Sequence, residues 1–306
     1  MTNLNYLEPG IRKLVTQFIN SSRPSVSKQT IQDRRKGYLS SINLAGEALP
    51  VWDVFEQTID DLRLRIYKPL DQGNLPIMIY YHGGCFVSGD FETHDRQLRQ
   101  IANLGGALVI AVDYRLAPEH VYPAAHDDAV KSVHVVRQHA LSWGGNPDNI
   151  SIAGDSAGGH LALVTCLRLK KQGHLMPKRQ ILIYPMLDAK ASSDSYKKFG
   201  DDYVVTADAL VSGFEAYLSN CLHPEHPEAS PLYSDDLEGL PETHILTAEF
   251  DPLVDEGEDF YRRLLNAGVE AQCQRYLGVT HGFFQLGGIS LAGRKAIQDV
   301  ATILSN

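Results

Sequence analysis

A serine set between glycines is the feature of this chain that points most directly to chemistry. Residues 154–158 read Gly-Asp-Ser-Ala-Gly, preceded by the short apolar and β-branched stretch 149–153 and followed by 160–171, which has the composition of a helix. A Gly-x-Ser-x-Gly pattern at a strand-to-helix junction predicts a tight, strained turn that pushes the serine hydroxyl clear of the sheet. The glycines leave room for strand and helix to approach each other. We therefore predict that Ser156 is a nucleophile at a helix N-terminus, where the helix dipole favours negative charge.

A glycine-rich turn follows the apolar run 75–81, where residues 82–85 read His-Gly-Gly-Cys. Backbone N–H groups must point at the oxyanion of a tetrahedral intermediate, and glycines let the backbone turn its amides without a blocking side chain. The alternative is an ordinary glycine turn after a strand. We predict an oxyanion hole built from amides of this loop and of the residue after the nucleophile, namely Gly83, Gly84, Cys85 and Ala157.

The acid that would orient a catalytic imidazole is expected at the end of a later strand. Residues 243–250 read as a strand that ends at Asp251. Asp255 is the competing acid, but Pro252 stiffens the turn between them and the chain from Leu253 onward reads as a helix. Asp251 is better placed to hold the imidazole and to stabilise it when protonated.

The chain has 12 histidines, of which His281 is the candidate general base. It follows the last predicted strand, 273–279, and precedes a glycine. It would take the proton of Ser156 and return it to the leaving alcohol. Ser156, Asp251 and His281 then occur in the chain order that is typical of α/β-hydrolases.

Together these motifs resemble the hormone-sensitive-lipase family of bacterial carboxylesterases. The matching stretches occur in the family's order over about two-thirds of the chain, at 82–84, 113–120, 154–159, 251–253 and 281–283. The resemblance implies the α/β-hydrolase fold: a mostly parallel eight-stranded sheet, helices on both faces and a helical cap, or lid. It also implies the triad and oxyanion amides named above, and often a homodimer. Cys85 departs from the family's fourth glycine, which narrows the space beside the acyl group.

The remaining pattern predicts a single α/β domain over residues 1–306. Residues 51–69 alternate apolar and polar, as expected of a strand hairpin, whereas the unbroken apolar runs 107–113 and 179–185 are typical of buried parallel strands. Strands alternating with helices argue for a mostly parallel sheet covered on both faces. The predicted helices lie at 120–141, 160–172 and 255–266.

Two segments depart from this alternation, and we predict that they form the cap. The first, about 1–46, contains an amphipathic helix near Leu14 and Phe18 and then the polar stretch 21–35. The second, about 186–226, contains the polar loop 192–200 and an amphipathic helix at 207–220. The catalytic core would then comprise about 47–185 and 227–306. Four aromatic residues are candidates for lining the substrate pocket, or else for packing the cap onto the core: Phe199, Tyr203, Phe214 and Tyr217.

One further stretch contains residue types that bind metals. Residues 223–228 read His-Pro-Glu-His-Pro-Glu, but the prolines exclude a helix there and no further ligand lies at a suitable spacing. We predict a loop of solvated charges and no metal site. The charges at 113–119 lie beside a strand end and predict ion pairs rather than a catalytic role.

Composition argues against several classes of partner. The net charge is −9 and no Lys/Arg-rich stripe is present, which disfavours nucleic acid and anionic membrane surfaces. No stretch is long and apolar enough to span a bilayer, and the chain does not open with a basic and apolar leader. The four scattered cysteines favour a reducing cytoplasm. A redox role for Cys85 is the alternative to a plain half-buried thiol.

The combined interpretation is a serine carboxylesterase that hydrolyses small esters of short to medium acyl chain through an acyl-enzyme, with no metal or organic cofactor. Cys85 favours the shorter acyl chains. Two alternatives stay open. One is an amidase or another acyl hydrolase with the same triad, and the other is a non-catalytic ligand receptor on the same fold, which the complete triad disfavours.

Overall fold

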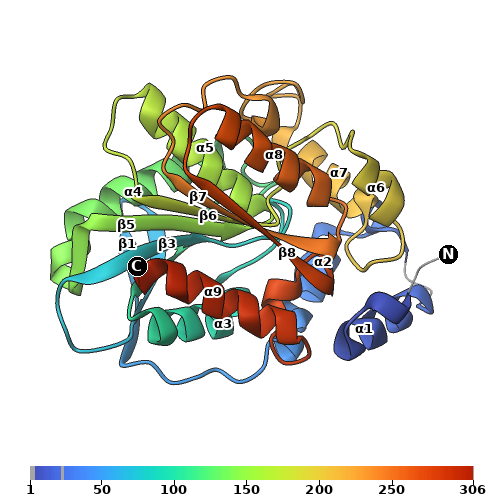
Figure 1. Ribbon diagram of the computed structural model, residues 1–306, viewed down its shortest axis with the longest axis horizontal. Coiled ribbons are helices and arrows are strands. Elements are labelled where there is room, and N and C mark those ends of the chain that lie inside the picture. The colour runs from blue at the N-terminus through green and yellow to red at the C-terminus, as the bar shows by residue number, and fades with distance from the viewer. Residues whose placement is uncertain (1–3, 22–23, 306) are drawn as a thin grey trace.

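The computed structural model describes residues 4–21 and 24–305, which build one eight-stranded sheet with helices on either side (Figure 1). The strands are β1 Asp53–Ile59, β2 Leu62–Lys68, β3 Leu75–Tyr81, β4 Leu108–Asp113, β5 Gly145–Asp155, β6 Arg179–Ile183, β7 Glu242–Phe250 and β8 Ala271–Thr280. The α-helices are α1 Pro9–Ile19, α2 Ile31–Leu39, α3 Phe91–Gly105, α4 Ala124–Trp143, α5 Ala157–Lys171, α6 Asp194–Phe199, α7 Ala207–Leu218, α8 Val254–Asn266 and α9 Leu291–Ser305. Short 3-10 helices lie at Leu4–Tyr6, Val26–Lys28, Ser40–Leu44, Pro231–Tyr233 and Phe283–Gln285.

The strands follow the order β1-β2-β4-β3-β5-β6-β7-β8 across the sheet. β1 and β2 form the predicted antiparallel hairpin, and β2 also pairs antiparallel with β4. Every neighbouring pair from β4 to β8 is parallel. All of β6 and all but the last residue of β4 are buried, as their unbroken apolar runs require of strands covered on both faces. The predicted mostly parallel eight-stranded sheet is confirmed.

Helices cover both faces of this sheet, as the alternating pattern predicts (Figure 1). α3 and α9 lie against one face, where Ile101 and Ile297 are buried in one apolar cluster. α4, α5 and α8 lie on the opposite face, where Leu161 and Phe260 are buried in a second cluster. Each amphipathic helix therefore buries its apolar stripe against one side of the sheet.

One stretch predicted as a polar loop is partly helical. α6 lies inside the predicted loop 192–200, because contacts from elsewhere in the fold hold its first turn. The N–H of Ser195 donates to Asp255 (2.8 Å), and its hydroxyl donates to the carbonyl of Pro252 (2.5 Å). Tyr196 beside it is buried. Ser195 owes its burial to those tertiary contacts, whereas Ser192, Asp194, Lys197 and Lys198 are exposed, as the polar composition predicts.

α2 begins inside the other polar stretch, 21–35. Thr30 precedes the helix and its hydroxyl accepts a hydrogen bond from the N–H of Asp33 (3.1 Å). This contact satisfies one of the N–H groups that have no partner at a helix start. The polar residues therefore belong partly to a capped helix whose residues are all at least partly exposed.

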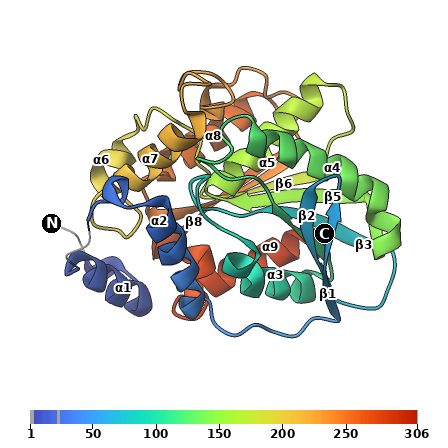
Figure 2. The same cartoon turned by 180° about the vertical axis from the view of Figure 1, so that it is seen from behind.

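The two predicted cap segments contact each other, and α2, α6 and α7 lie at one end of the molecule (Figure 2). The N–H of Ser27 donates to Asp208 in the first turn of α7 (2.8 Å), and Arg34 of α2 donates to the carbonyl of Ala209 (3.3 Å). Residues 1–3 and 22–23 of the first cap segment, and residue 306, lie outside the described residues. The division into cap and core stays a prediction.

A buried histidine pair joins the core helices to α7. His126 of α4 and His160 of α5 face each other through their Nε2 atoms (3.2 Å), and His126 Nδ1 lies 2.6 Å from the hydroxyl of Tyr217 on α7. Burial lowers the pKa of both imidazoles, to about 4 for His160, and the nearby positive charge of Arg168 lowers both further. Both rings are therefore neutral at pH 7.

We predict that the protein loses stability as the pH falls from about 6.5 towards 4. The unfolded chain binds protons on these histidines at about pH 6.5, whereas the folded chain resists protonation to lower pH. Above about pH 6.5 the neutral histidines do not oppose folding. On acidification the free energy of unfolding declines by up to about 3 kcal/mol on account of His160. Urea denaturation between pH 7.5 and 4.5 measures the decline. His160→Gln, which cannot titrate, should show a shallower dependence on pH, and identical slopes would contradict the prediction.

Candidate active site

Ser156 lies on the turn between β5 and α5 with φ 57° and ψ −118°, a conformation that non-glycine residues rarely adopt. Its N–H donates to the carbonyl of Ile183 (2.8 Å), which helps to hold this backbone in place. A Cβ added to Gly154 would overlap the backbone of Gly158, and one added to Gly158 would overlap the carbonyl of Tyr81. Glycine is thus required on both sides of the serine, as the pentapeptide pattern indicates.

The structure brings Ser156, His281 and Asp251 into one hydrogen-bonded line. His281 Nε2 lies 3.0 Å from Ser156 Oγ, and its Nδ1 lies 2.8 Å from Asp251 Oδ2. Because a carboxylate only accepts, Nδ1 carries the proton and the lone pair of Nε2 faces the serine hydroxyl. The three residues are 3%, 6% and 0% exposed in that order, so little water competes for these contacts. The arrangement can take the proton of Ser156 during nucleophilic attack.

The sheet positions these side chains at one edge, since Ser156 follows β5, Asp251 follows β7 and His281 follows β8, all parallel strands. The second oxygen of Asp251 accepts the N–H of Leu253 (2.8 Å), which fixes the carboxylate. Asp255 lies on α8, as predicted, and its Oδ2 accepts a backbone N–H of α6 instead (2.8 Å). The structure therefore separates the two candidate acids, and only Asp251 contacts the imidazole.

The loop after β3 offers two of its three predicted amides to the site. The N–H of Gly83 donates to Asp155 Oδ1 (2.8 Å), so it is not available to an oxyanion and its assignment is wrong. Gly84 and Cys85 border the same cavity as the serine, and within residues 4–21 and 24–305 neither N–H has a hydrogen-bond acceptor. Ala157 opens α5, where N–H groups lack partners within the helix. The amides of Gly84, Cys85 and Ala157 stay our prediction for the oxyanion hole.

Asp155 anchors the loop that follows β3, residues 82–86, which we call the oxyanion loop after its predicted role. The sequence pattern does not indicate this contact. Asp155 is 1% exposed. Its Oδ1 accepts hydrogen bonds from the N–H of Gly83 (2.8 Å) and the hydroxyl of Tyr80 (2.9 Å) and lies 3.0 Å from His94 Nε2, while Oδ2 accepts from Gln285 (3.1 Å). Burial opposes ionisation, but the charge and hydrogen bond of His94 outweigh it and lower the pKa of this carboxyl. An acid in the middle of a buried turn is the only signal of this role in the sequence.

Replacing Asp155 with asparagine should slow the chemical step. The amide has one acceptor oxygen and presents N–H groups to the other donors, so a buried donor of the oxyanion loop or of Tyr80 loses its partner. We expect kcat on 4-nitrophenyl esters to fall about 10-fold or more, because a misplaced oxyanion donor costs up to about 10²–10³. KM should change less than about threefold. Steady-state kinetics test this, with circular dichroism as the folding control, and an unchanged kcat in a folded variant would refute it.

Ser156 and His281 open onto a cavity of about 730 Å³. This volume is within the range of small-molecule sites. Its outer wall comes from segments far from the serine in sequence, including Leu14, Phe18, Tyr38, Leu44 and Val205. Cys85 also lines the cavity, and burial raises the pKa of its thiol to about 11. Because the thiolate is the reactive form, this favours packing over a redox role for Cys85.

The four aromatic residues predicted for the pocket do not line this cavity. Tyr203 stacks on Phe250 (ring centroids 5.3 Å apart), and Phe199 packs edge-on against the same ring. Phe214 and Tyr217 of α7 pack on a core ring, that of Phe86. The pocket assignment is corrected accordingly: these aromatic rings attach the second predicted cap segment to the core, which was the alternative that the sequence left open.

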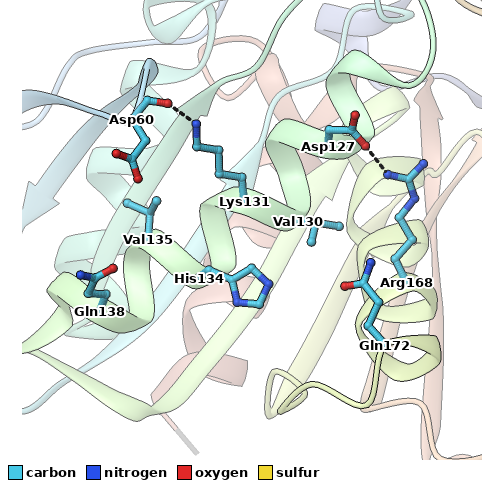
Figure 3. Close-up of a pocket in the computed structure, with 9 residues that line it drawn as sticks. All are labelled: Asp60, Asp127, Val130, Lys131, His134, Val135, Gln138, Arg168 and Gln172. Carbon is cyan, nitrogen blue, oxygen red and sulfur yellow. Dashed lines mark hydrogen bonds and ion pairs between the residues drawn. The ribbon is translucent and has the colours of Figure 1, made fainter.

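A second cavity, of about 340 Å³, lies between α4, α5 and the turn that joins β1 to β2 (Figure 3). Within it Arg168 pairs with Asp127 (2.7 Å), and Lys131 donates to the carbonyl of Asp60. His134 lies between them with a pKa lowered by burial. Its lining contains no serine or cysteine and shares no residue with the first cavity.

Within the described part of the chain, no group of three or more His, Cys, Asp or Glu side chains could hold a metal ion. In the loop 223–228, His223 and His226 each accept a backbone N–H two residues further on (3.4 and 3.1 Å). Glu228 pairs with Arg168 (2.5 Å). Among residues 4–21 and 24–305, every helix is too short or too polar to cross a membrane.

Comparisons with known proteins agree with this geometry. A family model described as the alpha/beta hydrolase fold matches residues 78–285. Carboxylic ester hydrolase LipN of Mycobacterium tuberculosis is 38% identical over 243 residues, which cover 76% of this chain but only 64% of LipN. Carboxylesterase NlhH of the same organism is 30% identical over 305 residues, covering 97% of this chain and 96% of NlhH. The solved structure of the hyperthermophilic esterase from Pyrobaculum calidifontis superposes with a TM-score of 0.92, at 37% identity and 98% coverage of both chains.

Proposed function

We propose that this chain, which belongs to the hormone-sensitive-lipase family of α/β-hydrolases and is a carboxylic ester hydrolase, cleaves esters of short to medium acyl chain through an acyl-enzyme on Ser156. The observation that carries the proposal is the unbroken contact from Asp251 through His281 to Ser156 at the wall of a cavity. The esterase names of the relatives and of the solved structure support the reaction class.

Acylation begins when Ser156 Oγ attacks the ester carbonyl carbon and His281 Nε2 takes the hydroxyl proton. The carbonyl electron pair moves onto oxygen and forms a tetrahedral oxyanion. Asp251 stays ionised, stabilises the imidazolium and keeps the ring oriented through the 2.8 Å contact at Nδ1. When the oxyanion collapses, the bond to the alcohol oxygen breaks. That oxygen takes the proton from Nε2 and departs as the alcohol, leaving the acyl group on Oγ.

Deacylation repeats these steps with water as the nucleophile. His281 takes a proton from water, the resulting hydroxide equivalent attacks the acyl carbon, and Ser156 recovers its proton as the carboxylic acid leaves. In both halves the oxyanion would be held by the amides of Gly84, Cys85 and Ala157, next to the N-terminus of α5. Because these amides are fixed before the reaction, no dipole needs to reorganise as charge develops.

The chain-length preference follows from the room beside the nucleophile. A cavity of about 730 Å³ admits a small ester with either a modest acyl group or a modest alcohol. Cys85 lines the cavity and carries a side chain at a position where glycine would leave space. Both features support short to medium acyl chains.

The test is a turnover profile on 4-nitrophenyl esters from acetyl to dodecanoyl, with Ser156→Ala as the control. We expect the highest kcat/KM at short to medium acyl chains and loss of turnover in the variant. A maximum at the longest chains would refute the proposed preference, and no turnover by the folded wild type would refute the mechanism. Matched amides tested alongside distinguish an amidase from an esterase.

We further propose a cytoplasmic location and a homodimer. The four cysteines are free, and Cys166 is buried, which suits a reducing compartment. The homodimer rests on the family resemblance alone. Cell fractionation with an antibody and light scattering of the purified protein test the two points, and a secreted pool or a monomeric mass would contradict them.

A further inference from the structure

Gly213 lies in the interior of α7, where glycine is about 1 kcal/mol less favourable than alanine. A Cβ added there would lie 2.5 Å from the Cβ of Cys85 and 2.7 Å from its carbonyl oxygen. Real Cβ atoms essentially never come so close to other heavy atoms. α7 can therefore pack against the oxyanion loop at this separation only with glycine at position 213.

The loop beneath Gly213 has an unusual backbone. Gly84, Cys85 and Phe86 have φ values of 122°, 54° and 63°. A left-handed conformation at two consecutive non-glycine residues costs about 1 kcal/mol or more at each, and it persists only where the surroundings enforce it. The directions of the Gly84 and Cys85 amides depend on these angles.

Contacts from α7, α2 and the loop after β4 enforce this conformation. The ring of Phe86 stacks on that of Tyr217 of α7, with centroids 4.4 Å apart and an interplanar angle of 12°. The carbonyl of Phe86 accepts the N–H of Ala117 (2.9 Å), and Arg35 of α2 donates to the carbonyl of Val87 (2.8 Å). Both helices belong to the predicted cap segments, so the strained loop is held between predicted cap and core.

We propose that Gly213 is a positioning residue of the oxyanion hole: by letting α7 lie directly on Cys85, it holds residues 84–86 in the strained conformation that aims two amides at the oxyanion. This inference rests on the proposed function, because it assigns a role at the same site. The oxyanion develops only in the transition state, so a displaced loop lowers kcat more than it raises KM. α7 would thereby act both as part of the predicted cap and as a support for the amides that stabilise the oxyanion.

The experiment places Gly213→Ala in three backgrounds that differ only at position 85. In the wild type and in Cys85→Ala, which keeps the Cβ, we expect kcat to fall about 10-fold or more with KM within about threefold. Cys85→Gly removes the 2.5 Å overlap with the Cβ and adopts positive φ freely, but it keeps the carbonyl oxygen at 2.7 Å. In this background the fall in kcat should therefore be smaller than in the other two, but not abolished. Glu215→Ala, on the exposed face of α7, is the matched control and should keep kcat within about twofold of wild type.

Comparing the fall in kcat among the three variants at position 85 distinguishes a positioning role of Gly213 from a general structural effect. An alanine inside a helix favours helix formation, so weaker helical propensity of α7 cannot explain a lower kcat. A kcat that is unchanged in Gly213→Ala, or that falls equally in all three backgrounds, overturns the proposal. If Gly213→Ala does not fold, Phe86→Leu loosens the same loop without an overlap. It must lower kcat at a retained KM, and an unchanged kcat overturns the proposal.

The controls keep this inference distinct from the function on which it rests. Ester turnover by the wild type, lost in Ser156→Ala, supports the mechanism whatever the Gly213 series shows. A wild type that turns over esters beside a fully active Gly213→Ala refutes the positioning role alone. A folded wild type without turnover refutes the proposed function itself.

Discussion

Ser156→Ala lowers kcat on 4-nitrophenyl butyrate by about 10⁶-fold, the largest effect expected of any single substitution here. Alanine removes the hydroxyl oxygen that lies 3.0 Å from His281 Nε2, so no acyl-enzyme can form. The His281 base and the oxyanion amides remain in place, so a slow direct attack by water persists, as in other serine hydrolases that lack the nucleophile. Steady-state kinetics at high enzyme concentration measure the residual rate.

Covalent labelling gives an independent check of the same serine. A 4-nitrophenyl phosphonate should react with the wild type, releasing one equivalent of 4-nitrophenol and adding one phosphonyl group to Ser156. Mass spectrometry of peptides would locate that group. The folded Ser156→Ala variant should release none. More than about 1% of wild-type turnover in the purified variant would mean that another group is the nucleophile, contrary to the expected loss of about 10⁶.

Asp251→Asn lowers kcat by about 10⁴-fold, the second largest expected effect. Asparagine can offer an N–H to Nδ1 of His281, which favours the tautomer with its proton on Nε2. The lone pair that now faces Ser156 at 3.0 Å is then lost. Because the substitution changes no volume and the site is buried, the geometry should stay intact while the base is disabled. The pH dependence of kcat/KM should show that the general base is disabled. The residual activity should rise at alkaline pH, because hydroxide replaces His281 as the base.

Asp255→Asn is the matched control, since Asp255 is the acid that sequence alone leaves in competition. Its carboxylate accepts a backbone N–H of Ser195 (2.8 Å), and the amide oxygen of asparagine can accept the same bond. We expect kcat to stay within about twofold of wild type. If Asp255→Asn proves the disabling variant and Asp251→Asn the mild one, the assignment of the triad acid is refuted.

Much of the candidate active site could be predicted from the sequence because local steric constraints specify it. Glycines at 154 and 158 are required by backbone overlap, and the turn they permit places Ser156 at a strand end. Asp251 and His281 were each predicted to follow a strand, and parallel strands align their carboxyl ends, so these positions are consistent with a shared edge of the sheet. The structure brings each of these three side chains, in the order Asp251, His281, Ser156, within hydrogen-bond distance of the next, whereas their catalytic roles stay predictions.

The parts that could not be predicted depend on contacts between distant segments. The N–H of Gly83 is taken by Asp155, a pairing between residues 72 apart that no local pattern encodes. The aromatic residues of α7 have the spacing of an apolar helix face, but that spacing does not say whether the face meets a cavity or the core. α3 and α9 are absent from the predicted helices, although Asp90 and Thr93 form a capping box at the start of α3.

The cavity described above has two parts with different origins, and this has a consequence for how such an enzyme can diversify. Ser156 and His281, the predicted nucleophile and base, follow strands of the sheet, while much of the remaining wall belongs to the segments 14–44 and 200–209. Those segments can be exchanged, by evolution or by grafting, to admit new substrates without disturbing the reacting groups. The exchange is constrained wherever these segments contact the loop after β3: Arg35 of α2 donates to the carbonyl of Val87, and a replacement that extends through α7 must keep a residue without a side chain over Cys85. We therefore expect substrate range to be separable from catalytic power in this fold, except at the contacts that hold this loop.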